Sequence, residues 1–256
     1  MKNRGPKRRI SIGNDGDVVR ISASADVTVS EDVRATLVCI DPSGDTAIDV
    51  TLKSRSSLHV VCLATEAPLT LRSTLAAESS IHWHCITLGS GGISTLRSEL
   101  IGEGARSDID WIFSVRGSER QSVDVRNVFN ARSGGGEITM KGVAEGKAHA
   151  GCSGMIEIGE AGQGTDTYLT EDVLMLDPTA KIDAVPGLEI RTNDVKASHS
   201  ATVSRVTVED LFYFQSRGIT PVEARRMYIE GFLGDLTERI PDDTIRAEIR
   251  EALTRS

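Results

Sequence analysis

The sequence predicts an all-β core in the form of a β-solenoid, followed by an α-helical segment. Gly accounts for 24 of the 256 residues and aromatic residues make up only 4%, which is typical of many short strands joined by tight turns. β-type runs fill the chain up to about residue 206, and capped amphipathic segments follow. We therefore divide the chain into a basic tail (1–14), a β core (15–206) and a helical region (207–256).

The N-terminal tail carries five basic residues before any acidic one, and we expect it to be solvated and mobile. These residues are Lys2, Arg4, Lys7, Arg8 and Arg9. No apolar stretch of a secretory signal follows them, and no run approaches the roughly 20 apolar residues of a membrane span. The net charge of −8 argues against nucleic acid as the main partner. Four cysteines without a CxxC motif predict no disulfide framework, so we expect a cytoplasmic protein.

The β core contains an internal repeat marked by cysteine. Its β-type runs are Asp26–Val29, Ala35–Ile40, Ile48–Leu52, Leu58–Leu63, Leu69–Leu71, Ile81–Ile86 and Ile109–Phe113. Cys39, Cys62 and Cys85 lie 23 residues apart in matching contexts. A fourth copy is predicted at Trp111–Phe113, which places Phe113 28 residues after Cys85.

A second pattern lies between the copies of the first. It recurs as Val50–Ser54, Leu69–Ser73, Ser94–Ser98 and Val123–Asn127, at spacings of 19, 25 and 29 residues. Two alternating strand types that return at these intervals predict stacked coils in which like residues lie above one another. An antiparallel sandwich also has many short strands and is the alternative at this point.

The helical region predicts three helices. Thr207 and Thr220 are expected N-cap residues, each with an acidic residue three positions later. We expect the first helix to stop at Gly218 and the second near Gly234, while a third begins around Pro241. Five of the eight Phe and Tyr residues lie between positions 212 and 232. These helices cover the solenoid, and either serve only as a cap or also dock a partner.

Several residues are candidates for chemistry. The cysteine ladder could carry sulfur or bind metal, but we interpret it as small apolar side chains stacked in the core. On a strand, His82 and His84 share one face, which we interpret as a polar outer face. Cys152 has small neighbours that leave room for access, and His199 is a competent iron or zinc ligand. The chain has no P-loop motif of its own.

The segment from Leu188 to Leu233 resembles the SufB/SufD scaffold family of Suf-type iron–sulfur cluster assembly. The resemblance is strongest over Asn193–Val203 and Glu209–Ile219, and weaker similarity extends back to about Leu100. It implies a right-handed parallel β-helix with C-terminal helices and pairing through the C-terminal end of the β-helix. It also implies that the helices dock a SufC-like ABC-type ATPase, and that a nascent cluster forms near the pair interface.

The resemblance transfers only part of the family's metal site. His199 matches the interface histidine of SufD-type members, but the cysteine two positions earlier is Ala197 here. The glutamate that SufB-type members place just after the histidine is Ser200, and their interface cysteine falls near Ala180. A homodimer would bring two His199 residues together. The other candidate metal ligands are Cys152, Asp183 and Glu189, with Cys152 preferred because thiolate is the usual cluster ligand.

Two functions follow from this resemblance. The first is a non-catalytic scaffold that holds a transient iron–sulfur cluster near a homodimer or heterodimer interface, while its ATPase partner hydrolyses ATP and this chain binds no nucleotide. The second is a structural SufD-like subunit that ligates nothing and organises the ATPase and a second scaffold chain. The predicted partner-binding residues are Leu211, Phe212, Tyr213, Arg217, Met227 and Phe232.

Overall fold

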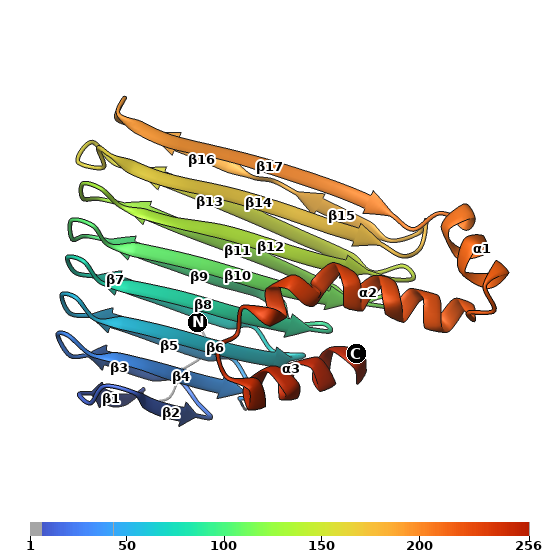
Figure 1. The fold of residues 1–256 in the computed structure, drawn as a ribbon, viewed down its shortest axis with the longest axis horizontal. Helices are drawn as coiled ribbons and strands as arrows, with labels where there is room; N and C mark the ends of the chain where they lie inside the picture. The colour runs from blue at the N-terminus through green and yellow to red at the C-terminus, as the bar shows by residue number, and fades with distance from the viewer. Residues whose placement is uncertain (1–6, 43, 256) are drawn as a thin grey trace.

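The computed structural model describes residues 7–255 except residue 43. Within them the chain forms two sheets of parallel strands and three helices (Figure 1). Sheet A contains β1 (Arg8–Ile12), β3 (Ala25–Val29), β5 (Thr46–Leu52), β7 (Leu69–Leu75), β9 (Gly92–Leu100), β11 (Arg120–Phe129), β13 (His149–Ile158), β15 (Lys181–Ala184) and β16 (Gly187–Ile190). Sheet B contains β2 (Asp17–Ile21), β4 (Arg34–Ile40), β6 (Ser57–Thr65), β8 (Ser80–Leu88), β10 (Arg106–Val115), β12 (Gly135–Ala144), β14 (Thr165–Met175) and β17 (Val195–Arg205). The helices are α1 (Val208–Ser216), α2 (Pro221–Glu238) and α3 (Asp243–Arg255).

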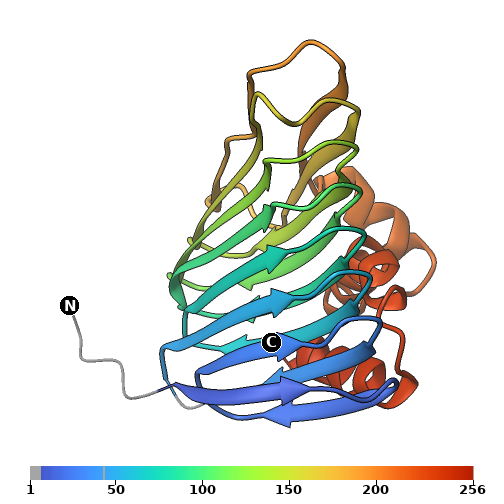
Figure 2. The same ribbon diagram turned by 90° about the vertical axis from the view of Figure 1, so that its left-hand side faces the viewer.

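The chain alternates between the two sheets from β1 to β14. Each strand from β1 to β13 pairs with the strand two positions later, while β14 pairs with β17 (Figure 2). All strand pairings among the described residues are parallel. The antiparallel sandwich is therefore excluded. The all-β core and the helical tail predicted from the sequence are confirmed.

The strand register confirms the cysteine repeat and corrects two of the predicted spacings. Cys39 pairs with Cys62, and Cys62 with Cys85. The next residue in this column is Trp111, two positions earlier than predicted. Between β5 and β7 the partner of Leu69 is Thr46, so the predicted spacing of 19 was wrong by four residues. Both errors are even numbers of residues, and the predicted inner and outer faces therefore survive them.

The space between the two sheets is an apolar core. Its largest buried side chains are Trp83, Trp111, Phe113 and Phe129. Cys39, Cys62 and Cys85 lie in the same core and form no disulfide. The Cys62 thiol and burial hold the pKa of Cys39 above its usual range, so this thiol stays protonated. The ladder thus has the packing role that we preferred for it.

The segment predicted as a basic tail divides into two parts. Residues 1–6 lie outside the described residues. Arg8–Ile12, by contrast, form β1 and pair with β3, because Ile12 enters the core with 1% of its surface exposed. Lys7 forms ion pairs with Asp26 and Asp49. The β core therefore starts at residue 8 rather than at residue 15.

The helices cover the outer face of sheet B (Figure 2). Capping boxes at Thr207 and Thr220 start α1 and α2 as predicted. The second helix does not stop near Gly234 but continues to Glu238. Leu233 and Leu236 are buried against the sheet, and this packing outweighs the cost of about 1 kcal/mol for a glycine within a helix. None of the described helices is both long and apolar enough to span a membrane.

Candidate functional site

The C-terminal end of the two sheets has unpaired strand edges. Among the described residues, β17 pairs only with β14, while β15 and β16 pair only with β13. Exposed apolar side chains line these strands, with Ile190 on β16 41% and Val203 on β17 52% exposed. An open edge of this kind presents backbone donors and acceptors to a further strand. At this end of the sheets, some of the predicted metal ligands lie on the inner face and others on the outer face.

His199 is the last residue of an apolar column that runs through sheet B. The column contains Leu37, Val60, Trp83, Ile109, Ile138, Leu169 and then His199. The preceding residues all lie in the core. Val195 and Ala197 of β17 pack against this core, and alternation places His199 on the same inner face. His199 is nevertheless exposed, since β17 is the edge strand of sheet B.

Cys152 lies in the same end of the core, on sheet A. It pairs with Ala184 of the edge strand β15 and is 2% exposed. Its Sγ atom lies 3.8 Å from Oε2 of Glu171, a fully buried residue on β14. The backbone N–H of Gly154 donates to Oε1 of Glu171 at 2.6 Å. A buried carboxyl group and a buried thiol thus face each other just inside the edge strands.

Burial controls the protonation of this pair. It raises the pKa of Glu171 to about 7, against the opposing hydrogen bond from Gly154. Burial and the nearby Glu171 charge also raise the pKa of the Cys152 thiol. A cation bound between the two groups would favour both deprotonated forms. The arrangement can therefore exchange protons for a metal ion.

The sequence analysis missed Glu171. The signal was present in β14, where alternate residues of Thr165-x-Thr167-x-Leu169-x-Glu171-x-Val173 face the core and only one of them is charged. Glu171 also occupies the column of the cysteine ladder, after Trp111 and Met140. A charged residue in an otherwise apolar column marks a position where packing alone does not determine the residue.

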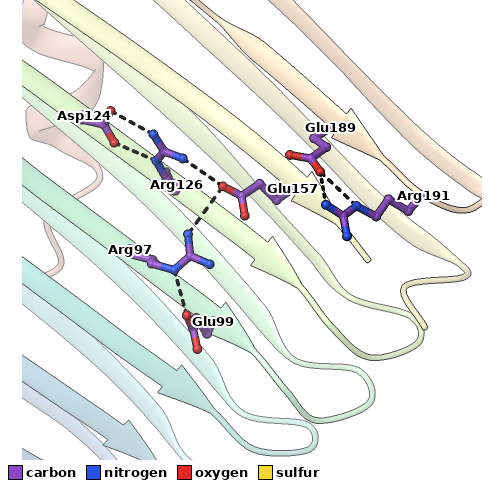
Figure 3. A network of polar contacts seen from close by, with 7 residues as sticks. All are labelled: Arg97, Glu99, Asp124, Arg126, Glu157, Glu189 and Arg191. Carbon is purple, nitrogen blue, oxygen red and sulfur yellow. Dashed lines mark hydrogen bonds and ion pairs between the residues drawn. The ribbon is translucent and has the colours of Figure 1, made fainter. Parts of the chain in front are cut away.

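Asp183 and Glu189 lie on the outer face of sheet A, away from Cys152. Asp183 is 71% exposed at its side chain, and its Oδ2 atom is 2.7 Å from Nε2 of His149. Glu189 accepts hydrogen bonds from Arg191 beside a network of ion pairs in which Glu157 bridges Arg97 and Arg126 (Figure 3). The structure thus brings Cys152 and His199 to the inner face and separates Asp183 and Glu189 from them.

The six predicted partner-binding residues divide into an exposed and a packed group. Phe212, Tyr213 and Met227 are 68%, 59% and 46% exposed. Arg217 lies over the Tyr213 ring, 5.6 Å from its centroid. Leu211 and Phe232 instead pack against the apolar layer between the helices and sheet B. The aromatic surface of α1 is therefore available on the outside of the molecule.

A family model described as the SufBD core domain of the SUF system for FeS cluster assembly matches residues 14–232. The chain belongs to the SufBD family. The matched region covers nearly the whole β core as well as α1 and most of α2. The resemblance that we noted over residues 188–233 is confirmed and extends far beyond that segment.

Curated relatives carry the same family assignment. The chain is 36% identical over 109 residues to the iron–sulfur cluster assembly protein SufD of Escherichia coli, covering 43% of this chain and 26% of the relative. It is 29% identical over 163 residues to SufD of Bacillus subtilis, covering 64% and 37%. A SufBD family protein of Mycobacterium bovis is 28% identical over 142 residues, covering 56% and 17%. In each case the match spans well under half of the relative.

Proposed function

We propose that this protein is a non-catalytic scaffold subunit of a complex that assembles iron–sulfur clusters. In this proposal the two sheets form a right-handed β-helix, in keeping with the usual hand of parallel connections. The edge strands β15, β16 and β17 pair with a second scaffold chain, either a copy of this one or a relative. The exposed aromatic side chains of α1 dock a SufC-like ABC-type ATPase, which binds and hydrolyses the nucleotide.

One observation carries the cluster-holding role. An apolar column ends in a single polar residue, His199, at the open end of the core that also contains the Cys152–Glu171 pair. Thiolate, imidazole and carboxylate are all ligands of iron in proteins. We propose that Cys152, Glu171 and His199 receive iron or nascent cluster as cargo. Asp183 and Glu189 would join this set only if the outer face of sheet A rearranged.

ATP hydrolysis by the partner supplies the opening step in this proposal. Cys152 is 2% exposed and is the register partner of Ala184 on the edge strand β15. In this proposal cargo reaches Cys152 only when β15 separates from β13. A partner attached to the helices that follow β17 can pull on this end of the core. The chain then contributes ligands and a deformable edge rather than a reaction of its own.

The second candidate function is a structural subunit that holds no cluster. It is favoured by the composition of the last strands, since residues 181–205 contain no cysteine and the nearest thiol is buried. In that case the chain organises the ATPase and a second scaffold subunit, and His199 contacts a cluster held by that subunit or none at all.

Anaerobic reconstitution separates the two functions. The chain is prepared alone and with its ATPase partner, loaded with iron and sulfide, and studied by native mass, absorption and Mössbauer spectroscopy. We expect a cluster on a dimer that is lost in Cys152→Ser and His199→Ala. The matched controls, Cys85→Ser in the ladder and His149→Ala on the outer face, should retain it. An ATPase complex that never retains iron would refute the scaffold role and leave the structural one.

A further inference from the structure

Three histidines from two neighbouring strands converge on the outer face of sheet B. They are His59 on β6 and His82 and His84 on β8, and His59 is the register partner of His82. One ring nitrogen of each lies within 4.8 Å of those of the other two. His59 Nδ1 and His84 Nε2 are 3.4 Å apart. Two nitrogens bound tetrahedrally to one zinc ion are about 3.3 Å apart, given bonds of about 2.0–2.1 Å.

The most buried of the three imidazoles, that of His84, is not fully hydrogen-bonded. His84 is 2% exposed, and its Nδ1 atom has no hydrogen-bond partner among the described residues. Buried polar atoms without a partner are rare in folded proteins. The other ring nitrogen of His84, Nε2, faces His59 Nδ1 and is the atom through which His84 would bind a metal ion.

A buried carboxylate on the adjacent strand contacts two of the three histidines. Asp110 on β10 places Oδ2 2.7 Å from His82 Nε2 and 3.6 Å from His84 Nδ1. Its other oxygen accepts a hydrogen bond from Arg239, at the end of α2, at 2.8 Å. An N–H donated to this carboxylate leaves the second nitrogen of His82 free to bind. Carboxylates occupy this position behind histidine ligands in many metal sites.

We propose that His59, His82 and His84 bind one divalent transition-metal ion, with Asp110 as the residue that orients the ligands. Three imidazole ligands suit zinc, and also cobalt, nickel or ferrous iron. The site differs from the proposed cluster site, because β8 and β17 are four strand positions apart in sheet B, or about 19 Å at the usual strand spacing. Through Asp110 and Arg239 the bound ion connects sheet B to the helical layer.

Cobalt titration of the metal-free, untagged chain tests the site without an ATPase partner or a cluster. We expect one Co²⁺ per chain, with visible d–d absorption bands of a nitrogen-ligated ion, and displacement by Zn²⁺. His59→Asn and His82→Asn should each weaken binding by at least tenfold, and Asp110→Asn by roughly 10–100-fold. His149, on the outer face of sheet A, provides the matched control, so His149→Asn should bind Co²⁺ as the wild type does.

Two further readouts keep the outcome decisive. Far-UV circular dichroism identifies any variant that fails to fold, and His59→Asn is the mildest of the set because His59 is only half-buried. Zn²⁺ should raise the melting temperature of the wild type and of the control variant His149→Asn, but not of His59→Asn. The proposal is overturned if the wild type binds no Co²⁺, or if the His59, His82 and Asp110 variants bind it as well as the wild type does. It is also overturned if a thiolate-to-cobalt absorption band assigns the ion to cysteine.

Discussion

Gly142 on β12 makes room for the ring of Phe113, and adding one methyl group there should destabilise the core. The two residues are register partners on adjacent strands, and Phe113 is fully buried. A Cβ atom at position 142 would lie 2.0 Å from Cζ and 2.1 Å from Cε2 of this ring. The nearest ordinary contact is 3.4 Å, so the ring would have to move by about 1.4 Å within a closely packed interior.

The magnitudes follow from this overlap. Gly142→Ala should lower the free energy of unfolding by about 1–3 kcal/mol, the usual cost of overpacking. Phe113→Ala should lower it by about 3–5 kcal/mol through loss of buried surface and formation of a cavity. In the double variant the new methyl group occupies part of that cavity. The combined loss should therefore be smaller than the sum of the single losses, by about 1–3 kcal/mol.

Urea unfolding followed by far-UV circular dichroism measures this coupling, provided that the four proteins have equal slopes. Gly231→Ala is the matched control, because Gly231 lies inside α2 with no atom within 4 Å of an added Cβ. It should stabilise the protein by up to about 1 kcal/mol. A neutral Gly142→Ala would show that the core accommodates the added methyl group without loss of stability. Strictly additive losses at positions 113 and 142 would show that the methyl group does not act through Phe113. Either result would refute the reasoning.

The helical layer yields three further predictions. Arg225 of α2 donates to both carboxylate oxygens of Asp177 at 3.0 Å. Because this pair is part-buried, Arg225→Met should weaken the packing of α2 on the sheet by about 1–2 kcal/mol. Hydrogen exchange of the α2 amides measures this loss. The Arg225 guanidinium lowers the pKa of Asp177 below its ordinary 3.8; the pair thus stabilises the fold above about pH 4 and is lost as pH falls through the lowered pKa. Asp177→Asn should remove that acid dependence, and an unchanged acid profile would contradict the assignment. Thr220→Ala removes a capping box with Glu223 and should lower the free energy of unfolding by about 1 kcal/mol, whereas Thr244→Ala, in the first turn of α3, should have little effect.

The overall architecture could be predicted from the sequence because stacked strands repeat their residues. Cys39, Cys62 and Cys85 keep one spacing, and their column is the one found in sheet B. The spacing changes after Cys85, where β9 is longer than β7 by two residues and the connection that follows it is longer by one. The pattern then no longer identified the partner of each residue. Trp111 rather than Phe113 continues the column, since a large aromatic side chain satisfies the core at either position.

The candidate site was less predictable because it depends on the register of the last strands. Gly151 pairs with Asp183 and Cys152 pairs with Ala184, so a single position decides which side chain points inward. No repeat of the sequence reaches this region to fix that position. His59 was overlooked for a different reason. Its context, Ser57-Leu58-His59, matches Ser80-Ile81-His82 at the same spacing as the cysteines, but only the cysteines were followed.

The helical layer also has a mechanical consequence for the strands beneath it. Proteins built from stacked repeats tend to unravel one unit at a time, because each unit touches only its neighbours. Here α2 and α3 contact strands that are far apart, because Arg225 pairs with Asp177 just after β14, Arg239 at the end of α2 with Asp110 on β10, and Glu248 with Arg20 on β2. The tail therefore acts as a brace along the stack. A load applied to α2 or α3 is shared among several strands of sheet B, whereas α1 follows β17 directly and transmits its load to that edge strand first.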